Sequence, residues 1–167
     1  MSPVSPEPPV FSRPGLITVL PFLVAVAATA FIAGRFRPGA WYEALAKPSW
    51  TPPGWLFAPV WFLLYLGIAV AGWILWRAAG SGASLPLALW AAQLVLNAAW
   101  SWLFFGLHRP GAALVDIVLL LVLILAFALT AHPFSPGAAW LFVPYGLWVL
   151  FATALNTAIV RLNPSGA

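Results

Sequence analysis

The chain has 167 residues, of which 63% are hydrophobic and only 6% are charged, and its mean hydropathy is +1.00. A soluble globular domain carries about 25% charged residues, so this composition excludes an ordinary soluble fold and places the chain in a lipid bilayer. The formal net charge is +4, but the cations are dispersed at the ends of apolar runs, which argues against a nucleic-acid partner. The absence of cysteine excludes disulfides, thiolate catalysis and cysteine metal ligands.

Residues 1–15 are rich in proline and serine and predict a flexible N-terminal tail that lacks the compact basic start of a signal peptide. Five apolar runs follow, each close to the roughly 20 residues that a helix needs to cross hydrocarbon. None shows the alternation of a membrane β-strand, so the predicted fold class is an all-α integral membrane protein, a bundle of five transmembrane helices with a structured first loop. The predicted spans are 16–34, 55–76, 85–107, 111–131 and 138–160, within one membrane domain over 16–162 that is followed by a short tail, 163–167.

Charged residues lie where one span gives way to the next, and they are distributed unevenly between the two sides. Arg13 and Arg77 share the side of the N-terminus. The opposite side carries five cations: Arg35, Arg37, Lys47, Arg109 and Arg161. In a plasma-type membrane the positive-inside rule then predicts an outer N-terminus and an inner C-terminus. The three later connections are short, so consecutive helices are expected to run antiparallel as neighbours.

The first connection contains WYEALAKPSWTPPGW at residues 41–55, an unusual concentration of aromatic residues and prolines. Its start favours a short helix in which Glu43 and Lys47, four residues apart, form an exposed ion pair. Thr51, placed before two prolines, predicts a capped start of the second span. Taken alone, the tryptophans are explained by an aromatic belt at the membrane surface.

Three spans carry large aromatic residues at helical spacing. The second presents Trp61 and Tyr65, and the fifth presents Tyr145 and Trp148. The third presents two amides between aromatic rings on one side: Trp90, Gln93, Asn97, Trp100 and Phe104. Amides at this depth are unfavourable against lipid, so that side predicts either an interhelical hydrogen-bond clamp or a ligand cavity. The small residues of the first span suit tight helix contacts, whereas aromatic faces leave gaps that suit a large planar molecule with polar edges.

Few residues could carry hydrolytic or metal chemistry. The serines have no matching histidine and acid nearby, and His108 and His132 lie in loops on opposite sides of the membrane, which argues against a metal site within one chain. An axial role for His108 toward a haem-type metal is the alternative to an ordinary interfacial histidine. Asp116 lies in an apolar run, and we interpret it as a structural partner for Arg109, for a helix N-terminus or for an adjacent helix.

The order and spacing of these motifs resemble the translocator protein family, also called the tryptophan-rich sensory proteins. An aromatic belt needs no fixed spacing, yet WY-x-x-L-x-KPSW-x-PP-x-W-x-x-x-PVW-x-x-L-Y runs from Trp41 to Tyr65. The similarity continues through later motifs: Gln93, Asn97 and Trp100, FFG at 104–106, ALVD at 113–116, VPY at 143–145, Trp148 and ALN at 154–156. It covers residues 16–162.

The resemblance implies a cavity for a porphyrin such as protoporphyrin IX, for a sterol or for synthetic benzodiazepine-type ligands, with no obligatory cofactor and no metal. It makes the first loop a lid over this cavity. Matching lid positions are Trp41, Tyr42, Lys47, Pro48 and Trp50. Matching wall positions are Trp61, Tyr65, Gln93, Asn97, Trp100, Phe104, Trp148, Ala152 and Leu155. Lys47, followed by Arg35 or Arg37, is the expected partner of a propionate carboxylate that stays near water.

Binding for porphyrin sensing, regulation or handling is the function that the resemblance favours, and two alternatives accompany it. Family members are associated with light-dependent porphyrin breakdown, and Trp61 and Trp148 match the positions implicated, so these two would be the photochemical residues of an enzyme. The other alternative is a transporter of tetrapyrroles or other small hydrophobic metabolites, although the chain shows no inverted repeat.

The resemblance also implies a homodimer within the lipid bilayer, and Ala92 and Ala99 on the third span could permit close contact between two copies. Thr157 stands where animal members carry the tyrosine of a sterol motif. This departure argues against a sterol function and favours a bacterial cell envelope.

Overall fold

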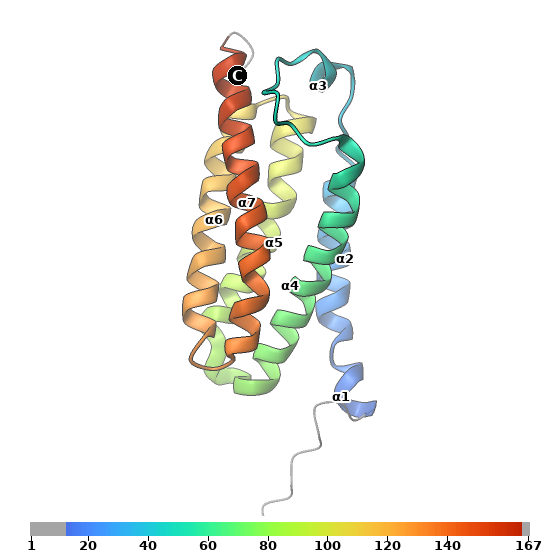
Figure 1. Ribbon diagram of the computed structural model, residues 1–167. Helices are drawn as coiled ribbons and strands as arrows, with labels where there is room; N and C mark the ends of the chain where they lie inside the picture. The colour runs from blue at the N-terminus through green and yellow to red at the C-terminus, as the bar shows by residue number, and fades with distance from the viewer. Residues whose placement is uncertain (1–12, 165–167) are drawn as a thin grey trace, which may run out of the picture.

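The structure, a computed structural model, describes residues 13–164. Five long helices run side by side in a single bundle (Figure 1): α2 (Leu20–Gly34), α4 (Phe57–Ala79), α5 (Ser84–Ser101), α6 (Pro110–Ala131) and α7 (Pro136–Leu162). Five helical segments are long and apolar enough to cross a membrane, and no strand occurs within the described residues. The predicted all-α membrane fold is therefore confirmed.

Shorter elements extend or join the long helices. α1 (Arg13–Ile17) precedes α2, a 3₁₀ turn (Gly54–Leu56) precedes α4, and another (Gly80–Ala83) joins α4 to α5. A π-helical turn (Trp102–Gly106) continues α5. α2, α6 and α7 each carry a proline in the first turn, where a backbone N–H would have had no helical partner. Local proline placement thus explains where three of the five long helices begin.

The two ends of the bundle carry different elements. Figure 1 shows the C-terminal end of α7 beside the first loop and its helix α3 (Ala40–Ala44), whereas α1 lies at the opposite end. α3 is shorter than the predicted helical stretch, because Leu45 already has extended backbone angles. Five spans between the two ends bring the first loop and the C-terminus to the same side of the bundle.

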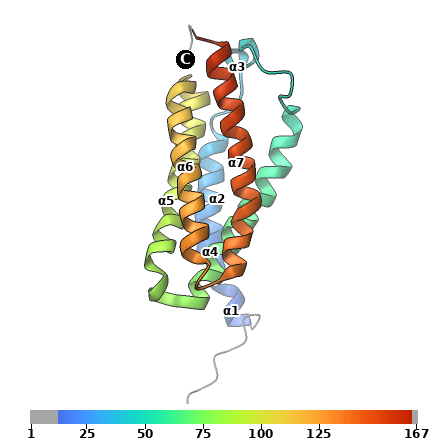
Figure 2. The same ribbon diagram turned by 60° about the vertical axis from the view of Figure 1, so that its left-hand side comes forward.

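The core lies where α5, α6 and α7 pack against one another and against α4. Buried Phe127 of α6 and Phe142 of α7 meet there with ring centroids 3.8 Å apart. α2 packs on α4 and α5 and crosses behind the bundle (Figure 2), with only Val26 and Thr29 buried. α2 is therefore the most peripheral of the long helices and leaves room beside its neighbours.

One close contact sets the position of α5 against α4. The indole Nε1 of Trp90 donates a hydrogen bond to the backbone carbonyl of Ile68 at 2.8 Å. A Cβ at Gly72 would lie 2.6 Å from that indole, so only glycine leaves space for the ring. With Trp90 held there, Gln93 and Asn97 on the same side of α5 are buried inside the bundle.

Candidate functional site

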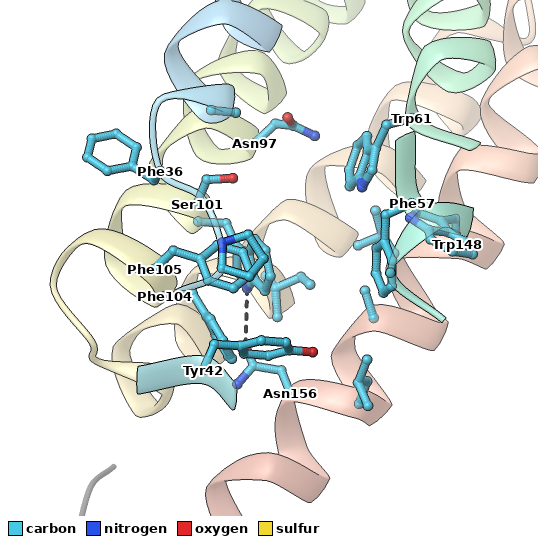
Figure 3. Close-up of a pocket in the computed structure, with 18 of the residues that line it drawn as sticks. Phe36, Tyr42, Phe57, Trp61, Asn97, Ser101, Phe104, Phe105, Trp148 and Asn156 are labelled. Carbon is cyan, nitrogen blue, oxygen red and sulfur yellow. Dashed lines mark hydrogen bonds between the residues drawn. The ribbon is translucent and has the colours of Figure 1, made fainter. Parts of the chain in front are cut away.

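A cavity of about 590 Å³ lies inside the bundle beneath the first loop (Figure 3). Its walls come from α2, α4, α5, α6 and α7, and its cover comes from the first loop. Small-molecule sites usually enclose roughly 300–1,000 Å³ and are lined mainly by apolar and aromatic side chains. The cavity matches that description in both size and lining.

Most of the site residues expected from the sequence line this cavity: Tyr42, Lys47, Trp61, Tyr65, Asn97, Trp100, Phe104, Trp148, Ala152 and Leu155. Figure 3 shows two aromatic groups facing each other across the space. Trp61, Phe57 and Trp148 stand on one side, and Phe104, Phe105 and Tyr42 stand on the other. A flat apolar molecule placed between them would meet ring faces or edges on both sides.

A chain of hydrogen bonds forms the end of the cavity that lies away from the first loop. The hydroxyl of Tyr65 donates to Oδ1 of Asn97 at 2.7 Å, and Nδ2 of Asn97 donates to the hydroxyl of Tyr145 at 2.9 Å. That hydroxyl donates to Oε1 of Gln93 at 2.9 Å, and Nε2 of Gln93 donates to the carbonyl of Trp90. The two amides therefore do form an interhelical clamp, and Asn97 also lines the cavity while Gln93 lies fully buried behind it.

A third amide, that of Asn156, holds the wall nearer to the first loop. The indole Nε1 of Trp100 donates to Oδ1 of Asn156 at 3.0 Å, and Nδ2 of Asn156 donates to the carbonyl of Pro110 at 2.9 Å. Trp100 also stacks on Phe104, with ring centroids 5.0 Å apart and an interplanar angle of 25°. These contacts join α5, α6 and α7 and fix the plane of the Trp100 ring.

The π-helical turn brings two consecutive phenylalanines to the cavity. Phe104 and Phe105 both line it, and the ring of Tyr42 meets them at centroid distances of 6.1 and 5.5 Å. A Cβ at Gly106 would lie 2.8 Å from the ring of Phe36, so this glycine allows the start of the first loop to pack closely. Such turns change the direction of side chains within a helix and are frequent at functional sites.

Aromatic contacts hold the two ends of the first loop. Trp41 stacks on His108 with centroids 4.3 Å apart, so His108 packs against the loop. Trp50 packs on Phe151 of α7 at 5.7 Å and is 48% exposed. Together with Pro48, these two tryptophans belong to the loop but lie outside the cavity lining.

Lys47 lines the cavity, and its ammonium also holds the loop together. Nζ donates to the carbonyl oxygens of Glu43 at 3.1 Å and Leu45 at 3.0 Å, and it lies 4.7 Å from the ring centroid of Tyr42. The expected pairing with the Glu43 carboxylate is thus replaced by a bond to the Glu43 backbone, because the end of α3 leaves carbonyls without helical partners. Burial raises the pKa of Tyr42 above its ordinary value, so this hydroxyl stays neutral.

Two sequence-based expectations near the site differ from the structure. Thr51 does not cap α4, because its hydroxyl donates to the carbonyl of Pro48 at 2.7 Å and Pro53 precedes the first turn. Asp116 is buried, but its Oδ2 has no hydrogen-bond partner among residues 13–164.

The same residues contain no group of three or more histidine, cysteine or acidic side chains that could hold a metal ion.

The wall that α2 contributes was not predicted from the sequence. Ala30, Ala33 and Gly34 line the cavity, although small residues in this span predict tight helix contacts. Phe57 also lines the cavity without having been predicted; it stands one helical turn before Trp61 and meets Trp148 at a centroid distance of 5.7 Å. The four-residue spacing between Phe57 and Trp61 could have indicated that both face the cavity. The local sequence does not distinguish a small residue in a tight helix contact from a small residue in a cavity wall.

The TspO/MBR family model matches residues 17–162, which include both the first loop and the walls of the cavity. Protein CrtK of Rhodobacter capsulatus is 39% identical over 148 residues, which cover 86% of this chain and 91% of that relative. Tryptophan-rich protein TspO of Chlorobaculum tepidum is 43% identical over 145 residues, or 82% and 90% of the two chains. The human Translocator protein is 37% identical over 156 residues, or 90% and 92%.

Proposed function

This chain belongs to the TspO/MBR family of membrane proteins, and from that premise we propose that it binds a tetrapyrrole such as protoporphyrin IX in the cavity beneath the first loop. Binding would serve porphyrin sensing, regulation or handling. The observation that supports this proposal most directly is the pair of aromatic walls, with Trp61 and Trp148 facing Phe104 and Tyr42 (Figure 3).

The charges around the cavity support a ligand with acidic edges. Lys47 lines the cavity, and no acidic residue is among the described residues that do so. A shallower hollow formed with Arg35 and Arg37 shares Ala30 and Gly34 with the main cavity. Propionate carboxylates extending from an apolar ring would therefore meet cations near the membrane surface, and charge-assisted hydrogen bonds are stronger than those between neutral groups.

Titration with protoporphyrin IX tests the proposal. In purified protein, tryptophan emission should be quenched and the quenching should saturate, because the ring would lie against Trp61 and Trp148. Trp61→Phe with Trp148→Phe should weaken both affinity and quenching. Trp140→Phe, in which the replaced ring is 68% exposed on α7, is the matched control and should bind like the wild type. Linear quenching without saturation would mean partition into detergent and would overturn the proposal.

Light-dependent breakdown of the bound porphyrin is the second candidate function. Trp61 and Trp148 both line the cavity, and Trp61 has two tyrosine rings nearby, Tyr65 at 5.3 Å and Tyr145 at 6.2 Å. An indole held against an excited porphyrin is placed to donate an electron to it. Under illumination the wild type should bleach bound porphyrin faster than the double variant Trp61→Phe/Trp148→Phe does. Equal bleaching rates would contradict the light-dependent breakdown and leave porphyrin binding as the only proposed function.

The proposal includes an assembly and a location. We place the protein as a homodimer in a bacterial cell envelope, with the N-terminus outside and the C-terminus inside. On α5, Ala92 and Val95 are exposed and Ala99 is half-buried, a surface on which a second copy could approach closely. Replacing Ala92 by Trp should then lower the dimer fraction that cross-linking detects in membranes, while Leu129→Trp, on an exposed position of α6, should not.

A further inference from the structure

The middle of the first loop is hydrogen-bonded to the helical bundle by a single side chain. Asn163 ends α7, and its Oδ1 accepts a hydrogen bond from the backbone N–H of Ala46 at 3.0 Å. Its Nδ2 donates to the backbone carbonyl of Ala46 at 2.9 Å. The other hydrogen bonds described for residues 38–52 stay within the loop. This pair of bonds therefore joins positions that stand 117 residues apart.

Asparagine suits this contact for chemical reasons. The amide exchanges two hydrogen bonds with one residue, as facing residues do in an antiparallel sheet. Its second Nδ2 hydrogen is also used, because Nδ2 donates to the carbonyl of Ile159 at 2.8 Å. Aspartate has the same shape but no donor, and alanine has neither group. The contact thus depends on the amide itself rather than on side-chain size.

The bonds act where no other described hydrogen bond joins the loop to the bundle, although the neighbouring Leu45 packs on a buried apolar cluster of the bundle. Aromatic contacts hold the α3 end of the loop, through Trp41 on His108, and its far end, through Trp50 on Phe151. Ala46 lies between these ends, and Lys47, the next residue, lines the cavity. The position of Asn163 therefore sets how closely the middle of the loop covers the cavity.

We propose that Asn163 is the latch of the first loop, and that a bound ligand leaves the cavity when the two hydrogen bonds to Ala46 open. The gating part rests on the proposed function, whereas the latch is a property of the chain without ligand. Asn163 does not line the cavity, so it is a positioning residue that acts through the loop.

Three substitutions break the latch from different sides. Asn163→Ala removes both bonds, and Asn163→Asp keeps the acceptor but turns an oxygen toward the Ala46 carbonyl. Ala46→Pro removes the N–H from the loop side, and Leu45 before it already has the extended backbone that a following proline requires. The backbone bond from Asn163 to Ile159 survives in every variant. Thr157→Ala is the control, because that hydroxyl bonds only within α7.

Hydrogen exchange of the full chain in lipid nanodiscs, without ligand, tests the latch. Amides of residues 39–52 should exchange about tenfold faster in Asn163→Ala, which loses both hydrogen bonds to Ala46, and in Asn163→Asp, which replaces one of them with a repulsion between two oxygens, while α5, α6 and α7 keep their protection. Adding Ala46→Pro to Asn163→Ala should add little, because both changes remove the same contact. Thr157→Ala should match the wild type. Unchanged loop exchange in the Asn163 variants would overturn the latch.

Dissociation of protoporphyrin IX, followed by recovery of tryptophan emission after dilution, tests the gating. We expect about tenfold faster dissociation in both Asn163 variants and a smaller change in the equilibrium constant, because an open loop also speeds entry. Faster loop exchange with unchanged dissociation would show that the ligand leaves by another path and would overturn the gating. If the wild type binds no protoporphyrin, the proposed function and the gating are both wrong, while the exchange data still decide the latch.

Discussion

Tyr145 is the residue on which both buried amides at the end of the cavity depend. Its hydroxyl accepts from Asn97 and donates to Gln93, and all three side chains are almost completely buried. We expect Tyr145→Phe to lower the free energy of unfolding by about 1–3 kcal/mol, the usual effect of leaving a buried polar group without a partner. Thermal unfolding in detergent, followed by circular dichroism, measures this change.

Tyr65→Phe is the matched comparison for that substitution. It removes one hydroxyl that bonds only Asn97 Oδ1, so one acceptor loses its donor and Gln93 keeps its contacts. The loss of stability should be smaller than for Tyr145→Phe. Equal stability of Tyr145→Phe and the wild type would contradict the description of this chain of hydrogen bonds as a clamp.

Cations near the cavity should raise the affinity for a ligand only where that ligand carries free carboxylates. Nζ of Lys47 already donates to two backbone carbonyls, so one donor remains for a carboxylate. Arg35 and Arg37 are exposed and flank the neighbouring hollow. We expect Arg35→Gln with Arg37→Gln to weaken protoporphyrin IX binding by about tenfold and to leave binding of its dimethyl ester unchanged.

Quenching titrations with both compounds separate this charge effect from a change in cavity shape. Arg161→Gln is the control, because that cation lies at the end of α7 and lines neither hollow. An equal loss of affinity for the acid and the ester would show that the arginines support the structure rather than the carboxylates.

At the scale of helices, Gly72 is the position where a single methyl group should disturb the bundle. A Cβ there would lie 2.6 Å from the Trp90 indole and 2.9 Å from the Phe22 ring, which pack α5 and α2 against α4. Gly72→Ala should cost about 1–3 kcal/mol of stability through overpacking, even though alanine favours a helix. Unfolding in detergent by heat or denaturant measures the loss.

Gly34→Ala is the control for that helix substitution. Nothing lies within 4 Å of a Cβ at Gly34, at the end of α2, so stability should stay equal or rise slightly. If Gly72→Ala is as stable as Gly34→Ala, then Trp90 can move without cost and the contact does not set the position of α5.

The spans could be predicted from sequence because bilayer thickness imposes one length on every helix that crosses it. Their extensions could not, since α4 and α7 continue past the apolar runs to Ala79 and Leu162, where helices need not end. The π-helical turn was also beyond sequence reasoning. The close approach of the Phe36 ring to Gly106, where a Cβ would lie 2.8 Å from it, likewise joins segments distant in sequence and exists only in the folded protein.

In the candidate site, too, residues that belong to sequence patterns could be predicted, whereas residues that act through tertiary contacts could not. Aromatic residues at helical spacing, together with the resemblance to a family, indicated Trp61, Trp100 and Trp148, which line the cavity. The latch had no such signal, because Asn163 and Ala46 are 117 positions apart, Ala46 occupies an unspecified position of the first-loop motif and Asn163 lies outside the motifs. Hydrogen bonds to backbone leave little trace in sequence, since any residue can supply the partner.

At the scale of the whole molecule, the features to which we assign a role in ligand exchange lie at one end of the bundle. The lid, the Asn163 latch and the hollow with Arg35 and Arg37 share the end at which α7 stops (Figure 1). The clamp formed by Asn97, Tyr65 and Tyr145 closes the other end of the cavity. If the C-terminus is inside, as we propose, then ligands enter and leave on the inner side of the membrane.

Two glycines offer a direct test of that orientation, because the chain has no cysteine and each introduced thiol would be unique. Gly39 lies in the first loop and Gly82 lies in the turn between α4 and α5, both are exposed, and nothing lies within 4 Å of a Cβ at either. The arrangement proposed here predicts that an impermeant maleimide labels Gly82→Cys in intact cells and labels Gly39→Cys only after the membrane is opened. The opposite pattern would place the cavity cover outside, and the two cations Arg35 and Arg37 would then lie on the side that the positive-inside rule disfavours.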